Sequence, residues 1–335
     1  MSERHQQAAS ELRDVLNSAA FGGVASVVWE GRPVIEVAGG LANRQTGEVN
    51  QIGTRFAVAS ISKMFTAVCM ARLVDAGLCR FEQSLDEIVP RLRPHFHPKV
   101  SIGSLLAHTS GVGDYIDDDA ELPFAGMDVA RLDSVEGFLP LVLNAPRLAP
   151  GVFHYSSAGY ILLGQAIETL TGIPFPAAIS RWVTEPAGLQ STGFPPLDEP
   201  STGLAVGYLP DGSPHFHHLP RVGGPDGGIV TNVADIQRLF NCLARGDFIS
   251  EPARRYLWRE VSKLSENEAY GHGFYVNKAC GEFWYGHTGS DPGLSARVAF
   301  APASGSSIVV LCNCQSTAFK AFRLALQWLN ESPGL

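Results

Sequence analysis

The sequence predicts an α/β (α+β) fold, in which an antiparallel sheet built from both ends of the chain is flanked by helices. Two β-rich runs lie near the start, at 24–43, and further runs with Gly-rich turns lie near the end, at 272–314. Between them, long apolar segments have the spacing of helices and are separated by Pro- and Gly-rich loops. Strands at both ends of a chain, joined by tight turns, favour one sheet with a mainly helical region inserted.

The predicted division of the chain follows from this pattern. Residues 1–67 and 231–335 are expected to form an α/β sandwich region, and residues 68–230 a mainly helical region. The functional site is expected at the junction of the two, because ligand clefts are common at such places.

The first elements are a helix and a hairpin. Residues 1–20 predict an amphipathic helix, and residues 30–33 (Glu-Gly-Arg-Pro) predict a hairpin turn between the two β-rich runs. The apolar positions on one side of that helix are Leu12, Val15, Leu16 and Ala19. Near the other end, 272–314 predicts three or four strands, and 317–332 predicts a closing helix.

The middle of the chain is predicted to be helical. The segment 61–78 predicts a helix that ends at Gly77, a residue typical of helix C-terminal caps. Further helices are predicted within 101–111, 133–145 and 157–172.

The charge pattern excludes several classes of partner. The formal net charge is -8, and the Lys and Arg residues are scattered, which does not favour nucleic acid or an anionic membrane. A small molecule is therefore the expected partner. No run of about 18 apolar residues is present, so no membrane-spanning helix is expected. Residues 1–20 lack the basic start and apolar run of a secretory signal, which predicts a cytoplasmic protein. The sequence indicates no oligomeric state.

No metal site is predicted. The six cysteines form no CxxC pair and several lie in apolar segments, so buried free thiols are expected. Histidines at 95 and 97, and at 215, 217 and 218, lie in Pro-flanked stretches without nearby cysteine, so packing or surface roles are expected for them.

Ser60 and Lys63 form the first candidate catalytic pattern, SxxK, at the start of a predicted helix. The i to i+3 spacing places both side chains on one face. A Ser hydroxyl needs a neighbouring base to act as a nucleophile, and a desolvated Lys can serve because burial lowers its pKa. Apolar neighbours on both sides place Lys63 away from water. The alternative is that Ser60 caps the helix and Lys63 is solvated.

Tyr155 is the second candidate. It lies in a loop directly before the helix predicted at 157–172, which Ser156 or Ser157 can cap. A Tyr phenol can act as a base only if a positive charge such as Lys63 lies nearby. The alternative is that Tyr155 packs where the chain enters the helix.

Residues 286–290, Gly-His-Thr-Gly-Ser, are the third candidate motif and follow an aromatic strand. Small residues at 288–290 would let a substrate lie against the strand edge, and the Ser290 backbone N–H could complete an oxyanion hole. A Gly-rich turn at a strand end is the alternative.

Together, these motifs resemble the serine β-lactamase and penicillin-binding-protein superfamily. The Tyr in the second motif is similar to that of the class C β-lactamase and DD-peptidase branch, which includes esterases and D-aminopeptidases. Four supporting stretches are similar to family motifs in the same order, and two of them contain the second and third motifs; they are 105–115, 155–172, 227–239 and 286–293. The resemblance implies the β-lactamase/DD-peptidase-like fold.

The resemblance also implies roles for three side chains. Ser60 would be the acylated nucleophile, Lys63 would deprotonate or hold it, and Tyr155 would pass the proton to the leaving group and later activate water. The backbone N–H groups of Ser60 and Ser290 would form the oxyanion hole. No metal or organic cofactor is implied.

Other positions would bind the substrate or support the site. His287 and Thr288 would orient the substrate, and Gly289 and Ser157 belong to the same binding motifs. Tyr115 would lie at the rim of the cleft. His108 is similar to a structural helix end, and a catalytic role as in a Ser-His-Asp triad is not expected.

Two residues depart from the family pattern. Ser157 stands where the family usually has Asn, and this shorter side chain offers no amide to a substrate. His287 stands where β-lactamases have Lys, whereas some DD-peptidases and esterases have His. Both departures make β-lactamase activity a weaker hypothesis.

The leading functional hypothesis is a hydrolase that cleaves a small ester or amide through an acyl-enzyme on Ser60. Its partner would be a small ester, an amide or a short peptide, as for a short-chain carboxylesterase or a D-amino-acid peptidase. The alternatives are an acyltransferase or peptide cyclase with the same acyl-enzyme, a weak β-lactamase, and a catalytically silent binding scaffold.

Overall fold

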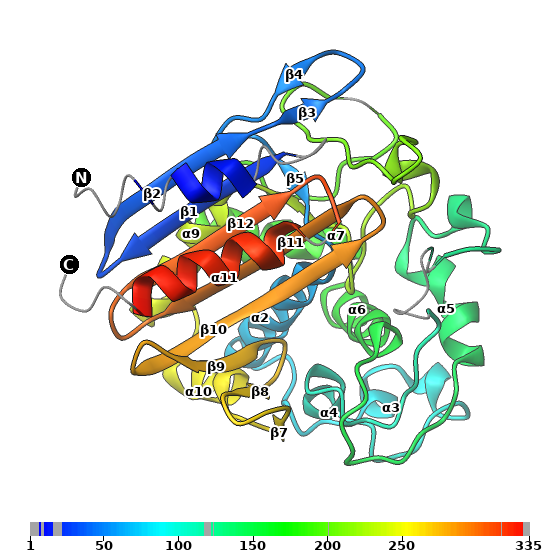
Figure 1. The fold of residues 1–335 in the computed structure, drawn as a ribbon. Helices are drawn as coiled ribbons and strands as arrows, with labels where there is room; N and C mark the ends of the chain where they lie inside the picture. Colours follow the sequence, from blue (N-terminus) through cyan, green and yellow to red (C-terminus); the bar gives the residue numbers. More distant parts are fainter. Residues whose placement is uncertain are drawn as a thin grey trace.

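The computed structural model describes residues 7, 10–15, 22–116, 122, 124–199, 201–315 and 317–330. In this part of the chain, eight strands form one antiparallel sheet in the order β2-β1-β12-β11-β10-β9-β8-β7 (Figure 1). The strands are β1 (Gly23–Trp29), β2 (Arg32–Gly39), β7 (Ser262–Lys263), β8 (Glu268–Tyr270), β9 (Tyr275–Ala279), β10 (Glu282–Asp291), β11 (Leu294–Ala301) and β12 (Ser306–Cys312). Because β1 pairs with β12, strands from both ends of the chain are neighbours, and the predicted fold class is confirmed.

Strands β9–β12 are the strands predicted within 272–314, whereas β7 and β8 were not predicted. These two strands have only two and three residues, respectively, so neither is long enough to show an alternating pattern.

The predicted hairpin joins β1 and β2, but its turn is shorter than residues 30–33. Glu30 (φ 47°) and Gly31 (φ 74°) both adopt the left-handed conformation, as the two-residue loop of a type I′ hairpin requires. Arg32 and Pro33 already belong to β2. Pro33 is tolerated because β2 is an edge strand of the sheet.

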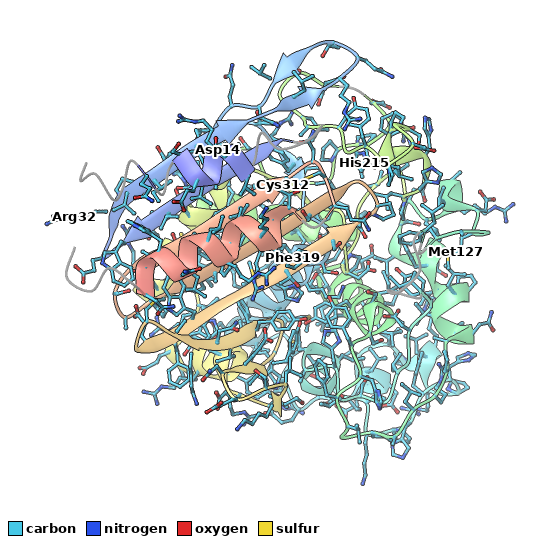
Figure 2. The ribbon with its side chains drawn as sticks, viewed as in Figure 1. Asp14, Arg32, Met127, His215, Cys312 and Phe319 are labelled. Atoms are coloured by element: carbon cyan, nitrogen blue, oxygen red, sulfur yellow. The ribbon has the colours of Figure 1, made fainter. Side chains whose placement is uncertain are left out.

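One face of the sheet is covered by α11 (Thr317–Asn330) and by the helical residues 10–15 (Figure 1). Leu12 and Val15, on the predicted apolar side, are buried in the same cluster as Phe322 of α11. Polar side chains of these two helices are exposed, among them Asp14, which Figure 2 labels. The predicted positions Leu16 and Ala19 lie outside the described residues.

The other face packs on three helices, namely α2 (Ser62–Asp75), α9 (Val233–Arg245) and α10 (Glu251–Trp258). Aromatic rings join two of them to the sheet. Phe240 of α9 stacks on Phe300 at 4.3 Å between ring centroids, and Trp258 of α10 stacks on Tyr285 at 4.4 Å. Stacked aromatic pairs add to the stabilisation from burial alone, so both helices are fixed against the sheet.

Helix α2 is the helix predicted at 61–78, and it ends as predicted. Gly77 has a φ of 73°, its N–H donates to Val74 O, and the N–H of Leu78 donates to Leu73 O. This pair of hydrogen bonds is a Schellman motif, which satisfies the last carbonyls of the helix.

The region between α2 and α9 is mainly helical. Its helices are α3 (Leu85–Ile88), α4 (Ile102–Leu106), α5 (Val135–Asn144), α6 (Ser157–Thr171), α7 (Phe175–Ile179) and α8 (Glu185–Ala187), with the short turns η2 (Pro90–Leu92), η3 (Val129–Arg131), η4 (Ser180–Thr184) and η5 (His215–His217). The three helices predicted here are α4, α5 and α6. Two small strand pairs complete the fold; they are β3 (Leu41–Asn43) with β4 (Glu48–Val49) and β5 (Phe56–Ala57) with β6 (Val230–Thr231).

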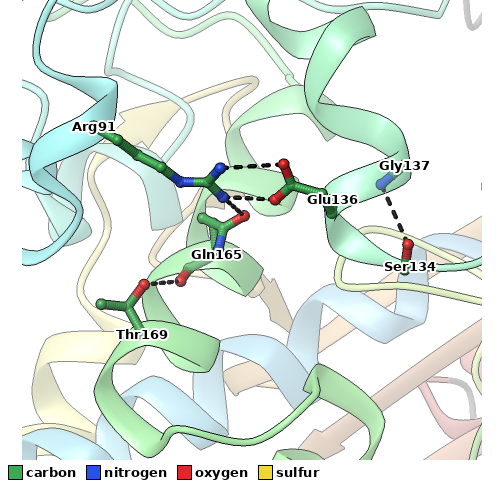
Figure 3. A network of polar contacts seen from close by, with 6 residues as sticks. All are labelled: Arg91, Ser134, Glu136, Gly137, Gln165 and Thr169. Atoms are coloured by element: carbon green, nitrogen blue, oxygen red, sulfur yellow. Dashed lines mark hydrogen bonds and ion pairs between the residues drawn. The ribbon is translucent and has the colours of Figure 1, made fainter.

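A polar network joins the helices of this region (Figure 3). The guanidinium of Arg91 donates to both carboxylate oxygens of Glu136 on α5, at 3.1 and 2.6 Å, and to Gln165 Oε1 on α6 at 2.9 Å. Arg91 therefore links the first turn of α5 to the middle of α6.

The six cysteines are free thiols, four of them buried and two half-buried. This confirms the expectation of free thiols and places most of them in the core. Among the described residues, no helix is long and apolar enough to cross a membrane.

Candidate active site

Ser60 lies in a 3-10 turn, η1 (Ala59–Ile61), directly before α2. The preceding residue, Ala59, has a φ of 46°, an uncommon conformation for a residue with a side chain. The alternative that Ser60 caps the helix is wrong, because Ile61 occupies the N-cap position and no side chain caps this end. The Ser60 hydroxyl instead accepts a hydrogen bond from Lys63 Nζ at 3.0 Å.

Lys63 is fully buried, with 0% of its surface exposed. Its Nζ lies 3.0 Å from Ser60 Oγ, 3.1 Å from Ser157 Oγ and 2.7 Å from the carbonyl oxygen of Asp226. The carbonyl can only accept, whereas each hydroxyl can donate or accept. The geometry therefore suits a charged amine with three donors, and equally a neutral amine whose lone pair faces the Ser60 hydroxyl.

The second motif lies at the start of α6. Ser156 is the N-cap, with its Oγ accepting from Gly159 N at 3.0 Å, and Ser157 is the first helical residue. Tyr155 thus lies in the loop before the helix, as predicted. Its ring centroid is 4.9 Å from Lys63 Nζ, so the amine lies over the ring face.

Two acidic residues of the site were missed by the sequence analysis. Asp114 accepts from the backbone N–H groups of Ser157 (2.6 Å) and Ala158 (3.2 Å), so its carboxylate fixes the N-terminus of α6. Asp226 contributes its carbonyl to Lys63, and its carboxylate accepts from the Tyr115 hydroxyl at 2.7 Å. Burial raises the pKa of the Asp226 carboxyl, whereas Lys63 opposes that shift.

A buried chain of hydrogen bonds joins the second motif to the third. Ser156 N–H donates to His108 Nδ1 at 3.0 Å, and His108 Nε2 lies 3.2 Å from the Tyr270 hydroxyl. That hydroxyl lies 3.0 Å from His287 Nε2, and His287 Nδ1 lies 2.6 Å from Thr288 O. The chain runs from the N-terminus of α6 to β10, and Tyr270 at its centre was not predicted.

The direction of each bond in this chain follows from its ends. An amide N–H only donates, so His108 Nδ1 accepts; a carbonyl only accepts, so His287 Nδ1 donates. Burial lowers the pKa of His108 well below its usual value and that of His287 to about 3, so both rings are neutral at pH 7. His108 Nε2–H therefore donates to Tyr270, and the Tyr270 hydroxyl donates to His287 Nε2.

The third motif lies on β10, at a free edge of the strand. Strand β9 pairs with β10 only as far as Gly286, and no strand in the described part of the chain pairs with residues 287–291 on that side. Gly289 lies against the turn that carries Ser60, because an added Cβ would be 2.2 Å from Val58 O. The small size of Gly289 is thus explained by contact within the chain.

His287 and Thr288 lie differently from the sequence expectation. The expectation was that both orient the substrate, but His287 is buried, with its two ring nitrogens bonded to Tyr270 and Thr288. Thr288 lies opposite Arg297 on β11 and lines a cavity that does not include Ser60. Alternation along the strand places Thr288 and His287 on opposite faces of the sheet.

A small cavity of about 50 Å³ opens beside Ser60. Its polar lining brings together Ser60, Ser157, Ser290 and Tyr115, four of the predicted site residues. Burial and the neighbouring Asp226 carboxylate raise the pKa of the Tyr115 hydroxyl well above its usual value, so Tyr115 is a hydrogen-bond donor here. The cavity is therefore lined by hydroxyl-bearing residues from distant parts of the sequence.

Comparison with known proteins identifies the family of this chain. Residues 6–330 match the family described as Beta-lactamase. The chain belongs to the beta-lactamase family. This agrees with the resemblance drawn from its motifs.

The relatives of this beta-lactamase-family chain include penicillin-binding proteins and an esterase. The crystal structure of a penicillin binding protein from Bacillus halodurans is 30% identical, with a TM-score of 0.84 over 95% of this chain and 98% of that one. Penicillin-binding protein 4 of Amycolatopsis lactamdurans is 27% identical over 87% of this chain and 80% of its own. Esterase EstB of Burkholderia gladioli is 33% identical, over 52% of this chain and 47% of its own. The family and these relatives make the chain a serine hydrolase.

The described residues were also compared with the requirements of a metal site. The described residues contain no group of three or more His, Cys, Asp or Glu side chains that could hold a metal ion. His215 is buried, and its Nδ1 accepts from Gly207 N at 3.0 Å, whereas His97 is exposed. The two histidine clusters are thus placed as packing and surface residues.

Proposed function

We propose that this protein cleaves a small ester or amide through an acyl-enzyme formed on Ser60. The observation that carries the proposal is the 3.0 Å contact between Ser60 Oγ and Nζ of the fully buried Lys63. A nucleophilic hydroxyl requires a base within hydrogen-bond distance, and an amine shielded from water can serve as that base.

In the proposed reaction, Ser60 Oγ attacks the carbonyl carbon while its proton moves to Lys63 Nζ. The backbone N–H groups of Ser60 and Ser290 stabilise the oxyanion. Tyr155, whose ring lies beside Nζ, passes the proton to the leaving group as the carbonyl–leaving-group bond breaks. A water molecule then attacks the acyl carbon, with Tyr155 accepting its proton, and Ser60 Oγ is released after regaining a proton.

The site lies at the junction of the two regions of the chain that we propose. Ser60, Lys63 and Ser290 come from residues 1–67 and 231–335, and Tyr155 and Ser157 come from 68–230. The small cavity supports a short acyl group, because about 50 Å³ leaves little room beside the nucleophile. The unpaired edge of β10 supports binding of an extended substrate by backbone hydrogen bonds.

An ester is the first choice of substrate. Ser157 provides a hydroxyl already bonded to Lys63 and no amide group that could recognise a peptide or acylamido group. A second candidate is a substrate with a free ammonium group, as in an aminopeptidase. The observation that favours it is a pair of carboxylates, Asp226 and Asp291, that line the same cavity and would attract a cation.

Intact-mass spectrometry tests the nucleophile. The protein is incubated with a fluorophosphonate, and a single adduct on Ser60 is expected that Ser60→Ala abolishes. Ser62→Ala is the matched control, because the Ser62 hydroxyl accepts from Ile229 N at 2.8 Å and is committed to the core. Labelling that survives Ser60→Ala would reject the proposed mechanism.

Turnover assays then rank the substrates. p-Nitrophenyl acetate and butyrate represent esters, alanine p-nitroanilides of both configurations represent amides with an ammonium group, and nitrocefin represents β-lactams. We expect the highest kcat/KM for the esters. A higher value for a p-nitroanilide would favour the second candidate.

A further inference from the structure

A second cavity, of about 260 Å³, lies on the face of the sheet that α11 covers, and it is larger than the cavity at Ser60. Strands β8–β11 form its floor, and Phe322 and Leu326 of α11 form one wall. In Figure 1, α11 lies over β11 and β12, while β8 and β9 lie beyond its edge. The cavity is therefore bounded by the sheet below and by the helix on one side.

Arg297 of β11 provides a cation at this cavity. The side chain is only partly exposed, and its guanidinium carbon lies 4.7 Å from the Phe322 ring centroid. Among the described residues, the Arg297 guanidinium has no hydrogen-bond or ion-pair partner. An Arg side chain remains charged near neutral pH, and a partly buried cation without an anionic partner is unfavourable, so an anion is a suitable ligand.

Glu268 of β8 lines the same cavity and provides an opposite charge. Its carboxylate attracts Arg297 electrostatically, but the two groups form no ion pair, and neither is bonded to another described residue. Lys278, a further cation of the lining, differs because its Nζ lies 3.5 Å from Glu260. One cation and one anion thus face the cavity with their hydrogen-bonding capacity unused.

The remaining lining is suited to an apolar group. Phe322 and Leu326 form the helix wall, and Trp284 lies on the floor. Thr288, directly opposite Arg297 in the β10–β11 pair, adds a hydroxyl beside the cation. A carboxylate could therefore accept from both Arg297 and Thr288 while its tail contacts the apolar wall.

We infer that this cavity binds a small carboxylate that carries an apolar tail. Arg297 binds the carboxylate, and Phe322 and Leu326 contact the tail. Glu268 sets a preference for a ligand with an ammonium group, such as a free apolar amino acid, over the corresponding simple acid. This inference does not depend on the proposed hydrolase function, since no residue that we place in catalysis takes part.

Calorimetric titration tests the inference with two probes, 3-phenylpropionate and phenylalanine. The titrations use the Ser60→Ala variant, so that turnover is absent, and intrinsic Trp fluorescence, to which Trp284 in the cavity contributes, provides a second signal. We expect both probes to bind. Arg297→Gln should lower the affinity for each probe by about tenfold or more, since a charge-assisted hydrogen bond is lost. Leu326→Trp, which fills the cavity, should abolish binding even if Arg297→Gln fails to fold.

The control is Lys320→Gln, which removes the same charge from an exposed position of α11. Its affinities should equal those of the parent. Glu268→Gln should lower the affinity for phenylalanine and should leave the affinity for 3-phenylpropionate unchanged or raise it. The inference would be overturned if neither probe bound at about 10 mM, or if Arg297→Gln and Leu326→Trp bound both probes as the parent does.

Discussion

The Tyr270 hydroxyl lies 3.0 Å from His287 Nε2 and donates to it, while accepting from His108 on its other side. This single phenol therefore joins the loop that carries Tyr155 to the strand that carries Ser290. The three rings of this hydrogen-bond chain, those of His108, Tyr270 and His287, are all buried. Because a buried polar group that loses its partner costs free energy, this hydrogen-bond chain fixes the relative position of the two motifs.

Removal of the Tyr270 hydroxyl should affect both stability and catalysis. Tyr270→Phe leaves a ring nitrogen of His108 and one of His287 without a partner, which should lower the free energy of unfolding by about 1–3 kcal/mol. The kcat for p-nitrophenyl butyrate should fall, because Tyr155 and β10 lose a common support. Urea unfolding and steady-state kinetics measure the two effects.

The matched control is Tyr285→Phe. Tyr285 is half-buried and stacks on Trp258 at 4.4 Å, and among the described residues its hydroxyl makes no hydrogen bond. Its substitution should leave both quantities nearly unchanged. Equal effects of the two substitutions would show that the hydrogen-bond chain through Tyr270 has no positioning role.

Two adjacent serines should respond differently to substitution by Ala. Ser157→Ala removes one of the three acceptors around Lys63 Nζ, so kcat should fall by about tenfold or more while the stability changes little. Ser156→Ala removes the N-cap of α6, so the free energy of unfolding should fall by about 1 kcal/mol. Thermal unfolding and kcat, measured on both variants, separate the roles. A purely structural effect of Ser157→Ala would contradict its assignment to the site.

The parts of the site that could be predicted are those fixed by local geometry. Ser60 and Lys63 share a helix face because their spacing is three residues, and Gly77 ends α2 because only a left-handed residue suits that position. Tyr155 was placed before its helix by the two serines that follow it. Each of these inferences needs only a few consecutive residues.

The parts that were missed depend on contacts between distant segments. Tyr270 is 162 residues from His108, and no pattern in the sequence indicates that they meet. The Asp226 carbonyl that accepts from Lys63 could belong to any residue, so it has no signature in the sequence. The interpretation of Gly289 changed for the same reason, because its neighbour Val58 comes from the other end of the chain.

Acidification should destabilise the protein through its buried histidines, of which His215 is the simplest to test (Figure 2). Burial lowers the pKa of His215 from 6.5 to about 4. The unfolded chain therefore takes up a proton as the pH falls below about 6.5, while the folded chain does not, so stability decreases as the pH falls toward 4. As the pH falls from 7 to 5, this one group should lower the free energy of unfolding by about 2 kcal/mol.

The variant His215→Gln should have lower stability at pH 7 but a shallower dependence on pH. The difference from the wild type should shrink by about 2 kcal/mol between pH 7 and 5, as measured by urea unfolding at each pH. His97→Gln, at an exposed position, is the control for replacing a histidine with glutamine. Parallel curves for the wild type and His215→Gln would exclude His215 as a source of acid sensitivity.

Gly289→Ala should disturb the turn that carries the nucleophile. The added methyl group would lie 2.2 Å from Val58 O, so either β10 or the segment before Ser60 must move. We expect a loss of about 1–3 kcal/mol in unfolding free energy and at least about a tenfold fall in kcat, because small displacements of a nucleophile are costly. Gly53→Ala is the matched control, since an added methyl there meets no atom within 4 Å. If Gly289→Ala were as active and as stable as Gly53→Ala, then the close contact between β10 and the nucleophile turn could not be what sets the position of Ser60.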